Sequence, residues 1–427
     1  MKKLIACSVA LLAMGALFAQ GSKEAAPSAA TAGKMELKGN LTMATNTSDP
    51  TLSAVQHVVD EFMKTNPGVT VEYTTYGKDY ENLMKAKMAA NDLPDVFATH
   101  GWGVKRYSEY LMDLSGCSFA SRLSNTIKGV VTTKDGRLVT IPYTIDKKGI
   151  IVNTGVLKKL GIDKPPRTWD EFYGDCEKVK QAGITGVYIA GKDNRSQAEL
   201  FDSSAQTFLV TMKGEGEENQ KALLDGTFDW SKWGRVAGFL DTLNKKGYLN
   251  KDANTADPVY KAEKLANGET LFMFGNWSLI QEAVGLNKDA ALTMMPVPVY
   301  DTNDTPVWTG GEREAYGVWK DSPNKDLAIA LLEFMAKPEN VTYIAEHSGM
   351  ATGFGDVTPN IPMFKVFEEP EYKELRTQPI FDREWLPSGM WATMRSSGAG
   401  VTSGELTVEQ ACQEMEKSYK KLLSQKK

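Results

Sequence analysis

The sequence predicts an α/β protein with more than one sheet. Strand-like and helix-like segments alternate from residue 41 to residue 98, and this order gives a parallel sheet with helices on both faces. The chain has 427 residues, and about 390 of them follow an apolar leader, which is more than one hydrophobic core usually supports. We therefore expect two domains.

The leader has the pattern of a secretory signal. Lys2 and Lys3 precede an uncharged apolar run over residues 4–19, which ends in the small residues Ala16 and Ala19. A basic start, a short apolar run and small residues at its end predict cleavage after Ala19. The run is shorter than the roughly 20 residues that span a bilayer, so a retained anchor is the weaker alternative.

The segment after the leader is predicted to be a flexible tether. Residues 20–39 are rich in Ala, Ser, Thr, Gly and Lys, and such a segment buries too little apolar surface to offset its chain entropy. A lipidated cysteine should follow the apolar run, whereas Cys7 lies near its start, so we do not expect a lipid anchor. The predicted location is periplasmic or otherwise extracytoplasmic.

Three strands and two helices are predicted in the first hundred residues. Strands are expected at 41–44, at the β-branched segment 69–74 and at 95–98. The first helix follows from an apolar stripe at helical spacing and ends at Asn66-Pro67-Gly68; the stripe consists of Val55, Val58, Val59, Phe62 and Met63. The second helix has the same spacing at Tyr80, Leu83, Met84 and Met88.

Three later helices have recognisable starts. Thr168 with Glu171, and Thr407 with Gln410, have the spacing of a capping box, in which two side chains satisfy free amides of the first turn. Ser322-Pro323 is expected to start a third helix, with proline at its first position.

Composition excludes several classes of protein. The formal charge of −5 becomes −7 when Lys2 and Lys3 are removed, and this acidity argues against a nucleic-acid binder. Cys117, Cys176 and Cys412 are far apart and lack metal-ligand spacing, so we expect no metal and no other cofactor. Buried single thiols are expected, with one disulfide as the alternative.

A series of short segments carries a family resemblance. They are Asn66-Pro67-Gly68-Val69, Leu93-Pro94-Asp95-Val96, Pro142-Tyr143 with Val152-Asn153-Thr154, Lys164-Pro165-Pro166-Arg167-Thr168-Trp169-Asp170-Glu171, and Ala266-Asn267-Gly268-Glu269 with Gly275-Asn276-Trp277. Together they resemble the extracellular solute-binding proteins of ABC importers, in the sugar-binding, maltose-binding-protein-like branch (family 1). The resemblance implies a two-lobed periplasmic-binding-protein (clamshell) fold, in which each lobe is a mainly parallel sheet flanked by helices and the hinge is crossed several times.

The resemblance also implies a division of the chain and a function. Lobe one would hold residues 40–144 and 305–336, lobe two 152–302 and 345–427, and the hinge region 145–151, 303–304 and 337–344. Such a protein captures a mono- or oligosaccharide between its lobes and delivers it to the transmembrane subunits of a permease. It acts as a monomer and performs no covalent chemistry.

Polar residues follow each of the first three predicted strands. In open parallel sheets, ligands bind outside the carboxyl ends of the strands. The candidates there are Asn46, Ser48 and Asp49 after the first strand, Tyr76 after the second, and Thr99, His100 and Trp102 after the third. Hydrogen-bonding groups with an aromatic plate suit a polyol, whose hydroxyls must be paired when they are buried.

The resemblance places further residues in the cleft. Trp277 matches an aromatic that meets the sugar from lobe two, and Trp391, in a motif that ends at Arg395, matches an aromatic that stacks on the ligand. Asp146 matches an acidic hinge residue that accepts sugar hydroxyls. Trp102 and its neighbours replace an aspartate and an arginine of the maltose binders, which argues against maltose itself.

The glycines of Thr309-Gly310-Gly311-Glu312-Arg313-Glu314 would let the backbone approach another group closely, and Glu312 or Arg313 would reach the cleft. Each site residue also has a plain structural alternative. Trp102, Trp277 and Trp391 would be core residues, Asp146 an exposed hinge charge, and Glu312 and Arg313 a surface ion pair.

Two rival functions are open from the sequence. The same fold would bind a polyamine, an organic acid or a chelated metal if its cleft were lined by suitable groups. A secreted glycoside hydrolase also needs aromatic residues and two carboxylates at a fixed separation. Asp and Glu total 54, but none stands in a recognisable catalytic motif, so we expect no enzyme.

Overall fold

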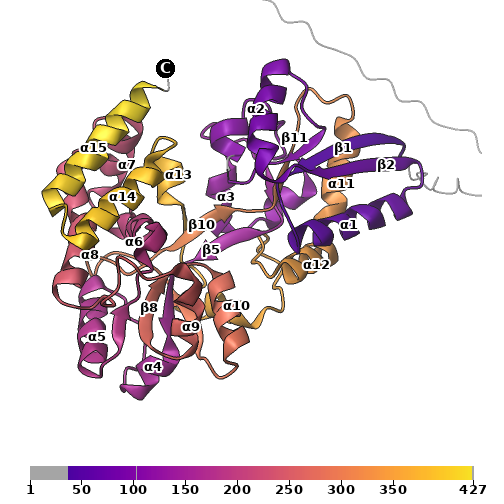
Figure 1. Ribbon diagram of the computed structural model, residues 1–427. Coiled ribbons are helices and arrows are strands. Elements are labelled where there is room, and N and C mark those ends of the chain that lie inside the picture. The colour runs from indigo at the N-terminus through magenta and orange to yellow at the C-terminus, as the bar shows by residue number, and fades with distance from the viewer. Residues whose placement is uncertain (1–36, 102, 426–427) are drawn as a thin grey trace, which may run out of the picture. The chain divides into compact units, whose positions relative to one another are not determined.

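The structure is a computed structural model that describes residues 37–101 and 103–425 (Figure 1). The predicted signal at 1–19, most of the tether at 20–39 and Trp102 therefore lie outside the described residues. Residues from Leu37 onward form one compact unit. Within it, two lobes with separate hydrophobic cores are joined by a small sheet.

The first lobe is built on a five-stranded sheet with the order β2-β1-β3-β11-β4. The strands are β1 (Gly39–Thr45), β2 (Val69–Thr75), β3 (Val96–Ala98), β4 (Ile141–Pro142) and β11 (Ala315–Val318). β1 pairs in parallel with β2 and β3, and α1 (Thr51–Thr65) and α2 (Tyr80–Ala90) connect these strands. The predicted β-α-β-α-β order is confirmed.

Helix α1 buries the stripe that predicted it. Val55, Val58, Val59 and Phe62 are buried, and the helix packs against α11 (Lys325–Met335) and α12 (Pro338–Ser348). Burying each such side chain contributes roughly 1.5–3 kcal/mol relative to leaving it in water. This stripe therefore fixes which face of α1 turns inward.

The second lobe contains a four-stranded sheet with the order β7-β8-β6-β9. Its strands are β6 (Ile150–Asn153), β7 (Thr185–Val187), β8 (Thr270–Phe274) and β9 (Leu292–Met295). Its longer helices are α5 (Trp169–Gln181), α6 (Arg195–Ala205), α7 (Gly216–Asp225), α8 (Gly234–Lys245), α10 (Trp277–Leu286), α14 (Met390–Ser403) and α15 (Val408–Ser424). Shorter helices are α3 (Asn125–Val131) in the first lobe, and α4 (Thr154–Lys159), α9 (Lys261–Ala266) and α13 (Phe381–Trp385) in the second.

The expectation of mainly parallel sheets is wrong in detail. β11 runs antiparallel to β3 and β4, and β6 runs antiparallel to β8 and β9. The physical reason is the connectivity, because β11 and β6 enter their sheets directly from the hinge and not through a helical crossover.

A three-stranded sheet joins the lobes, with the order β12-β10-β5. β5 (Ile145–Lys148) and β10 (Trp308–Glu312) run antiparallel and lie side by side between the lobes (Figure 1), and β12 (Thr377–Pro379) pairs in parallel with β10. The lobe boundaries that we expect from the family resemblance stay a prediction.

Two of the three predicted helix starts are confirmed. Thr168 with Glu171 and Thr407 with Gln410 both form complete capping boxes. The third prediction is wrong, because α11 begins at Lys325 and the Ser322 hydroxyl is instead hydrogen-bonded to Asp95 at 2.6 Å.

Cys117, Cys176 and Cys412 are free thiols. Among the described residues, no helix is both long and apolar enough to cross a membrane.

Candidate ligand-binding cleft

The carboxyl ends of β1, β2 and β3 meet at one edge of the first-lobe sheet. Thr45 and Thr75 are register partners at the ends of β1 and β2. The Tyr76 amide donates to the Thr45 carbonyl at 2.9 Å, and the Thr75 hydroxyl donates to the Thr47 carbonyl at 2.7 Å. The loops after these two strands are therefore tied to each other.

The loop after β1 presents Asn46, Ser48 and Asp49. Ser48 and Asp49 are exposed, and Asp49 accepts the Ser53 amide at 3.1 Å in the first turn of α1. The Asn46 side-chain oxygen is buried and has no hydrogen-bond partner among the described residues. Buried polar atoms are nearly always paired, so this oxygen marks a place for a donor.

The loop after β3 contributes Thr99 and His100, while Trp102 lies outside the described residues. Thr99 is buried, with its hydroxyl 3.0 Å from that of Thr140. Burial, with the charges of Arg313 and Arg383, lowers the pKa of His100 to about 4, against the opposing effect of Asp146. His100 is therefore neutral near pH 7 and offers one ring nitrogen as donor and one as acceptor.

The hinge sheet supplies Asp146, Glu312 and Arg313. Asp146 lies opposite Gly311 in the pairing of β5 with β10, and both Asp146 and Arg313 are half-buried. A Cβ on Gly310 would lie 1.7 Å from the Asp146 carbonyl oxygen, so the close approach predicted for these glycines is to β5 itself. Glu312 is turned inward and is 2% exposed.

The second lobe contributes the two predicted tryptophans and Arg395. Trp277 is half-buried at the start of α10, and its ring meets Phe364 and Phe367 edge to face. Trp391, near the start of α14, is half-buried against the second-lobe core. The Arg395 guanidinium donates to the Asp193 carbonyl at 3.0 Å.

Helix α13 contributes charged residues that the sequence analysis did not select. Arg383 lies against the loop after β3, since a Cβ on Gly101 would be 2.9 Å from its guanidinium. Lys105 of the first lobe reaches the Arg383 carbonyl at 3.3 Å and the Glu384 carboxylate at 3.4 Å. The only available signal was a charged run, Asp382-Arg383-Glu384, between the buried Phe381 and Trp385.

Helix α13 also contributes one member of a buried pair of carboxyl groups, Asp382 and Asp202. The Asp382 amide donates to Asp202 at 2.9 Å, and one Asp382 oxygen is buried without a partner among the described residues. Burial, with the neighbouring Asp202 charge, raises the pKa of Asp382 to about 7. Lys148 and Arg383 are the cations that face the pair.

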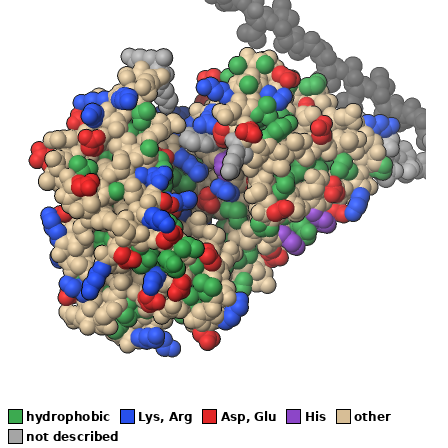
Figure 2. All heavy atoms as spheres, in the orientation of Figure 1, with side chains coloured by type: hydrophobic (Ala, Val, Ile, Leu, Met, Phe, Trp, Pro, Cys, Tyr) green, Lys and Arg blue, Asp and Glu red, His purple; other side chains and the backbone are tan. Residues whose placement is uncertain are grey.

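A cavity of about 40 Å³ separates the loop after β3, the hinge strand β10 and α13. That volume holds a water molecule or two. Around it, lysine and arginine side chains gather at the hollow between the lobes (Figure 2). The polar side chains of the cavity wall are Lys105, Glu312, Arg383 and Glu384. Hydrogen-bond donors and carboxylates of this kind suit a ligand rich in hydroxyl groups.

Among residues 37–101 and 103–425, no group of three or more His, Cys, Asp or Glu side chains is placed to hold a metal ion.

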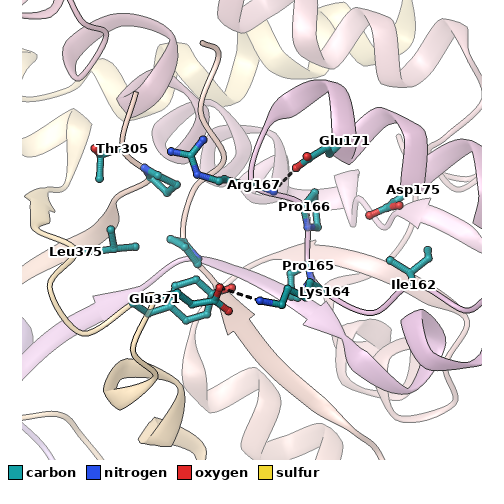
Figure 3. Close-up of a pocket in the computed structure, with 13 residues that line it drawn as sticks. Ile162, Lys164, Pro165, Pro166, Arg167, Glu171, Asp175, Thr305, Glu371 and Leu375 are labelled. Carbon is teal, nitrogen blue, oxygen red and sulfur yellow. Dashed lines mark hydrogen bonds and ion pairs between the residues drawn. The ribbon is translucent and has the colours of Figure 1, made fainter. Parts of the chain in front are cut away.

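A second cavity, of about 490 Å³, shares none of these residues. Its walls include Pro165, Pro166 and Tyr372, and its charged groups are paired (Figure 3): Lys164 with Glu371 at 3.3 Å, and Glu171 with the Arg167 amide at 2.7 Å. Part of its wall comes from the Lys164–Glu171 motif, which leads into α5.

Comparison with known families settles the class of protein. The model of the family described as bacterial extracellular solute-binding protein matches residues 45–342, more than half of the chain. The chain belongs to this family. The predicted membership among solute-binding proteins is confirmed.

Relatives of this solute-binding protein include the melibiose/raffinose/stachyose-binding protein MelE of Bacillus subtilis (strain 168). It is 32% identical over 384 residues, which cover 89% of each chain. A Bacillus subtilis binding protein in an open conformation is 32% identical with a TM-score of 0.86, over 91% of this chain and 98% of that one. A Bacillus licheniformis sugar transporter protein in complex with stachyose is 34% identical with a TM-score of 0.71, over 90% and 100%. The predicted two-lobed fold is confirmed.

Proposed function

We propose that this solute-binding protein captures a neutral oligosaccharide of the melibiose, raffinose or stachyose type and delivers it to an ABC permease. It works outside the cytoplasm, after cleavage of the signal near Ala19, and leaves the sugar unaltered. The proposal extends the ligands named for MelE and for the stachyose complex to this chain.

The observation that carries the proposal is the meeting of polar groups from both lobes at the hinge. His100 and Arg313 come from the first-lobe side, Asp146 from the hinge strand and Arg383 from the second lobe, and the three charged residues act electrostatically on His100. Such a set can donate to and accept from hydroxyl groups on several sides of a ligand.

Charge supports a neutral ligand over a polyamine or an organic acid. The cations Arg313, Arg383 and Lys105 lie in the same region as the carboxylates of Asp146 and Glu384, so charges of both signs are present there. A polyamine would meet the arginines and an organic acid the carboxylates, in each case at an electrostatic cost. A sugar hydroxyl pairs with either sign.

Closure of the two lobes is the proposed mechanism. Contacts from both lobes act on the ligand together only when the lobes close, so the ligand favours closure by its differential affinity. Moving the population from 1:99 to 99:1 needs about 5.5 kcal/mol of such preference. At nearly equal identity, the higher TM-score against the open structure than against the stachyose complex supports an unliganded, open starting state.

Calorimetric titration and thermal unfolding with stachyose, raffinose and melibiose test the proposal, with maltose, spermidine and citrate as comparison ligands. A true ligand at a hundredfold excess over its Kd stabilises the protein by about 2.7 kcal/mol. We expect stabilisation by a galactoside and a smaller radius of gyration in solution scattering. Stabilisation by spermidine or citrate alone, or release of free galactose from the bound sugar, would overturn the proposal.

A further inference from the structure

Two buried glutamates on the hinge segment each hold one of the polar loops of the first lobe. We propose that Glu312 and Glu314 are positioning residues: Glu312 fixes the β3 loop (residues 99–101 and 103) and Glu314 fixes the β1 loop (residues 46–49) for ligand binding. The inference depends on the proposed function, because those loops are its first-lobe ligand surface.

Glu312 reaches from β10 to the β3 loop. It is 2% exposed, and its Oε1 atom accepts the Gly103 amide at 2.7 Å. A Cβ on Gly103 would lie 3.0 Å from that same oxygen and 2.8 Å from the Thr140 methyl group, so a side chain at this position would crowd the contact. Arg383 is the charged group that faces the carboxyl.

Glu314 reaches the β1 loop through a chain of hydrogen bonds. It is 2% exposed, and its Oε1 atom accepts the Thr45 hydroxyl at 2.9 Å and the Tyr316 hydroxyl. The Thr45 hydroxyl oxygen in turn accepts the Thr47 amide at 3.1 Å. The carboxylate therefore orders the backbone that follows β1.

The backbone of Glu314 also joins the two hinge crossings. Its carbonyl accepts the amides of Tyr143 at 2.9 Å and Thr144 at 3.2 Å, and its own amide donates to the Thr144 hydroxyl at 3.0 Å. The segment that leaves the hinge into β11 is thus fastened to the segment that enters it before β5.

Burial at these two positions is costly, which argues that the groups serve a purpose. Burial raises the pKa of Glu312 to about 7 and raises the pKa of Glu314, although hydrogen bonds to each carboxylate act in the opposite direction. An apolar side chain at either position would avoid that cost. Between them, Arg313 is half-buried and lies near His100, so the three side chains alternate between the loops and the cleft.

The test compares two substitutions at each glutamate. Glu312→Gln and Glu314→Gln keep an acceptor oxygen, whereas Glu312→Met and Glu314→Met remove it at similar volume. Thr45→Val breaks the path from Glu314 to Thr47 and leaves the glutamate intact. The matched control is Asp95→Asn, another buried acid of the first lobe whose hydrogen bonds go to Thr42, Ser322 and Asn324 and to neither loop.

Two readouts are required on the full mature chain: peptide-resolved hydrogen exchange without ligand, and the Kd for stachyose by calorimetry. We expect Glu312→Met to speed exchange in the β3 loop only, and Glu314→Met and Thr45→Val in the β1 loop only. Each should weaken stachyose binding about tenfold or more, and each Gln variant should stay within about threefold of the wild type.

We expect the Asp95→Asn control to exchange faster across the whole first lobe. The same uniform pattern in Glu312→Met and Glu314→Met would show that the glutamates stabilise the lobe in general, and it would overturn the inference. So would faster loop exchange with unchanged affinity. If the wild type binds no oligosaccharide at all, the proposed function fails, and the loop-selective exchange pattern still decides whether the glutamates hold the loops.

Discussion

The indole N–H of Trp277 donates to the carbonyl oxygen of Lys147 at 2.6 Å, which ties the first residue of α10 to the hinge strand β5. The same ring meets Phe364 and Phe367 edge to face. The orientation of the ring is therefore fixed by the hinge as well as by packing. This relationship makes Trp277 the most informative aromatic to alter.

Trp277→Phe should weaken stachyose binding by no more than about tenfold, because it keeps an aromatic face and loses one hydrogen bond worth roughly 0.5–1.5 kcal/mol. Trp277→Ala and Trp391→Ala should each weaken binding by well over about tenfold, since both remove an aromatic face. Trp391→Ala should change unliganded stability little, whereas Trp277→Ala should also lower it, because the hydrogen bond to Lys147 and the contacts with Phe364 and Phe367 are lost. Calorimetry and thermal unfolding measure the two effects. Normal affinity with a much lower Tm in both alanine variants would make these residues core and not ligand contacts.

Asp95 should give the first lobe an acid-sensitive component of stability. Burial alone would raise the pKa of Asp95, but hydrogen bonds from Ser322, Thr42 and Asn324 outweigh it and hold the pKa below its usual range. Below about pH 5 the unfolded chain therefore binds the proton more readily than the folded chain, and the stabilisation is lost as the pH falls.

Asp95→Asn should accordingly cost about 2 kcal/mol at pH 7 and flatten the decline in unfolding free energy between about pH 5 and pH 3. Urea unfolding at several pH values measures both. A variant that loses stability in acid as steeply as the wild type would contradict the assignment.

Asp382 should change the free energy of unfolding with pH in the opposite direction to Asp95. Burial and the Asp202 charge raise its pKa to about 7, so the folded chain holds this proton more tightly than the unfolded chain. Stability from this group is complete below about pH 4 and is lost as the pH rises towards 7.

Asp382→Asn removes the titration and should make the unfolding free energy less dependent on pH between about 4 and 7. Its stability relative to the wild type should be greater at pH 7.5 than at pH 4.5. Asp163→Asn is the control, because Asp163 is an exposed acid of the second lobe. An equal pH slope in wild type and Asp382→Asn would refute the coupled pair.

Arg167 should stabilise the segment that leads into the hinge strand β10. Its guanidinium donates to the Thr302 carbonyl at 2.9 Å and the Asp304 carbonyl at 2.6 Å, just before β10. A lysine has no planar fork to reach both carbonyls.

Arg167→Lys should therefore cost about 1 kcal/mol and lower Tm by about 1–2 °C. Differential scanning calorimetry measures the change. Lys164→Ala, which breaks only the exposed ion pair with Glu371, should leave Tm nearly unchanged. Equal effects of the two substitutions would show that Arg167 does not act through the two carbonyls.

Elements with local sequence signals were predictable without a structure. The apolar stripe of α1, the capping boxes at Thr168 and Thr407, and the β-α-β-α-β order were all readable, because each depends on residues a few positions apart. The predicted start of α11 was wrong because the Ser322 hydroxyl donates a hydrogen bond to Asp95, which is 227 positions away in the sequence.

Which side chains meet depends on long-range packing. Arg383 reaches the loop after β3 from α13, Glu312 accepts the Gly103 amide, and Glu314 accepts the Thr45 hydroxyl. The spacing of apolar residues along the chain cannot predict such contacts, because they join segments that are adjacent only after the two lobes and the shared hinge sheet have formed. Periodicity and capping therefore determined the elements of this protein, whereas long-range packing decided how its polar residues face the cleft.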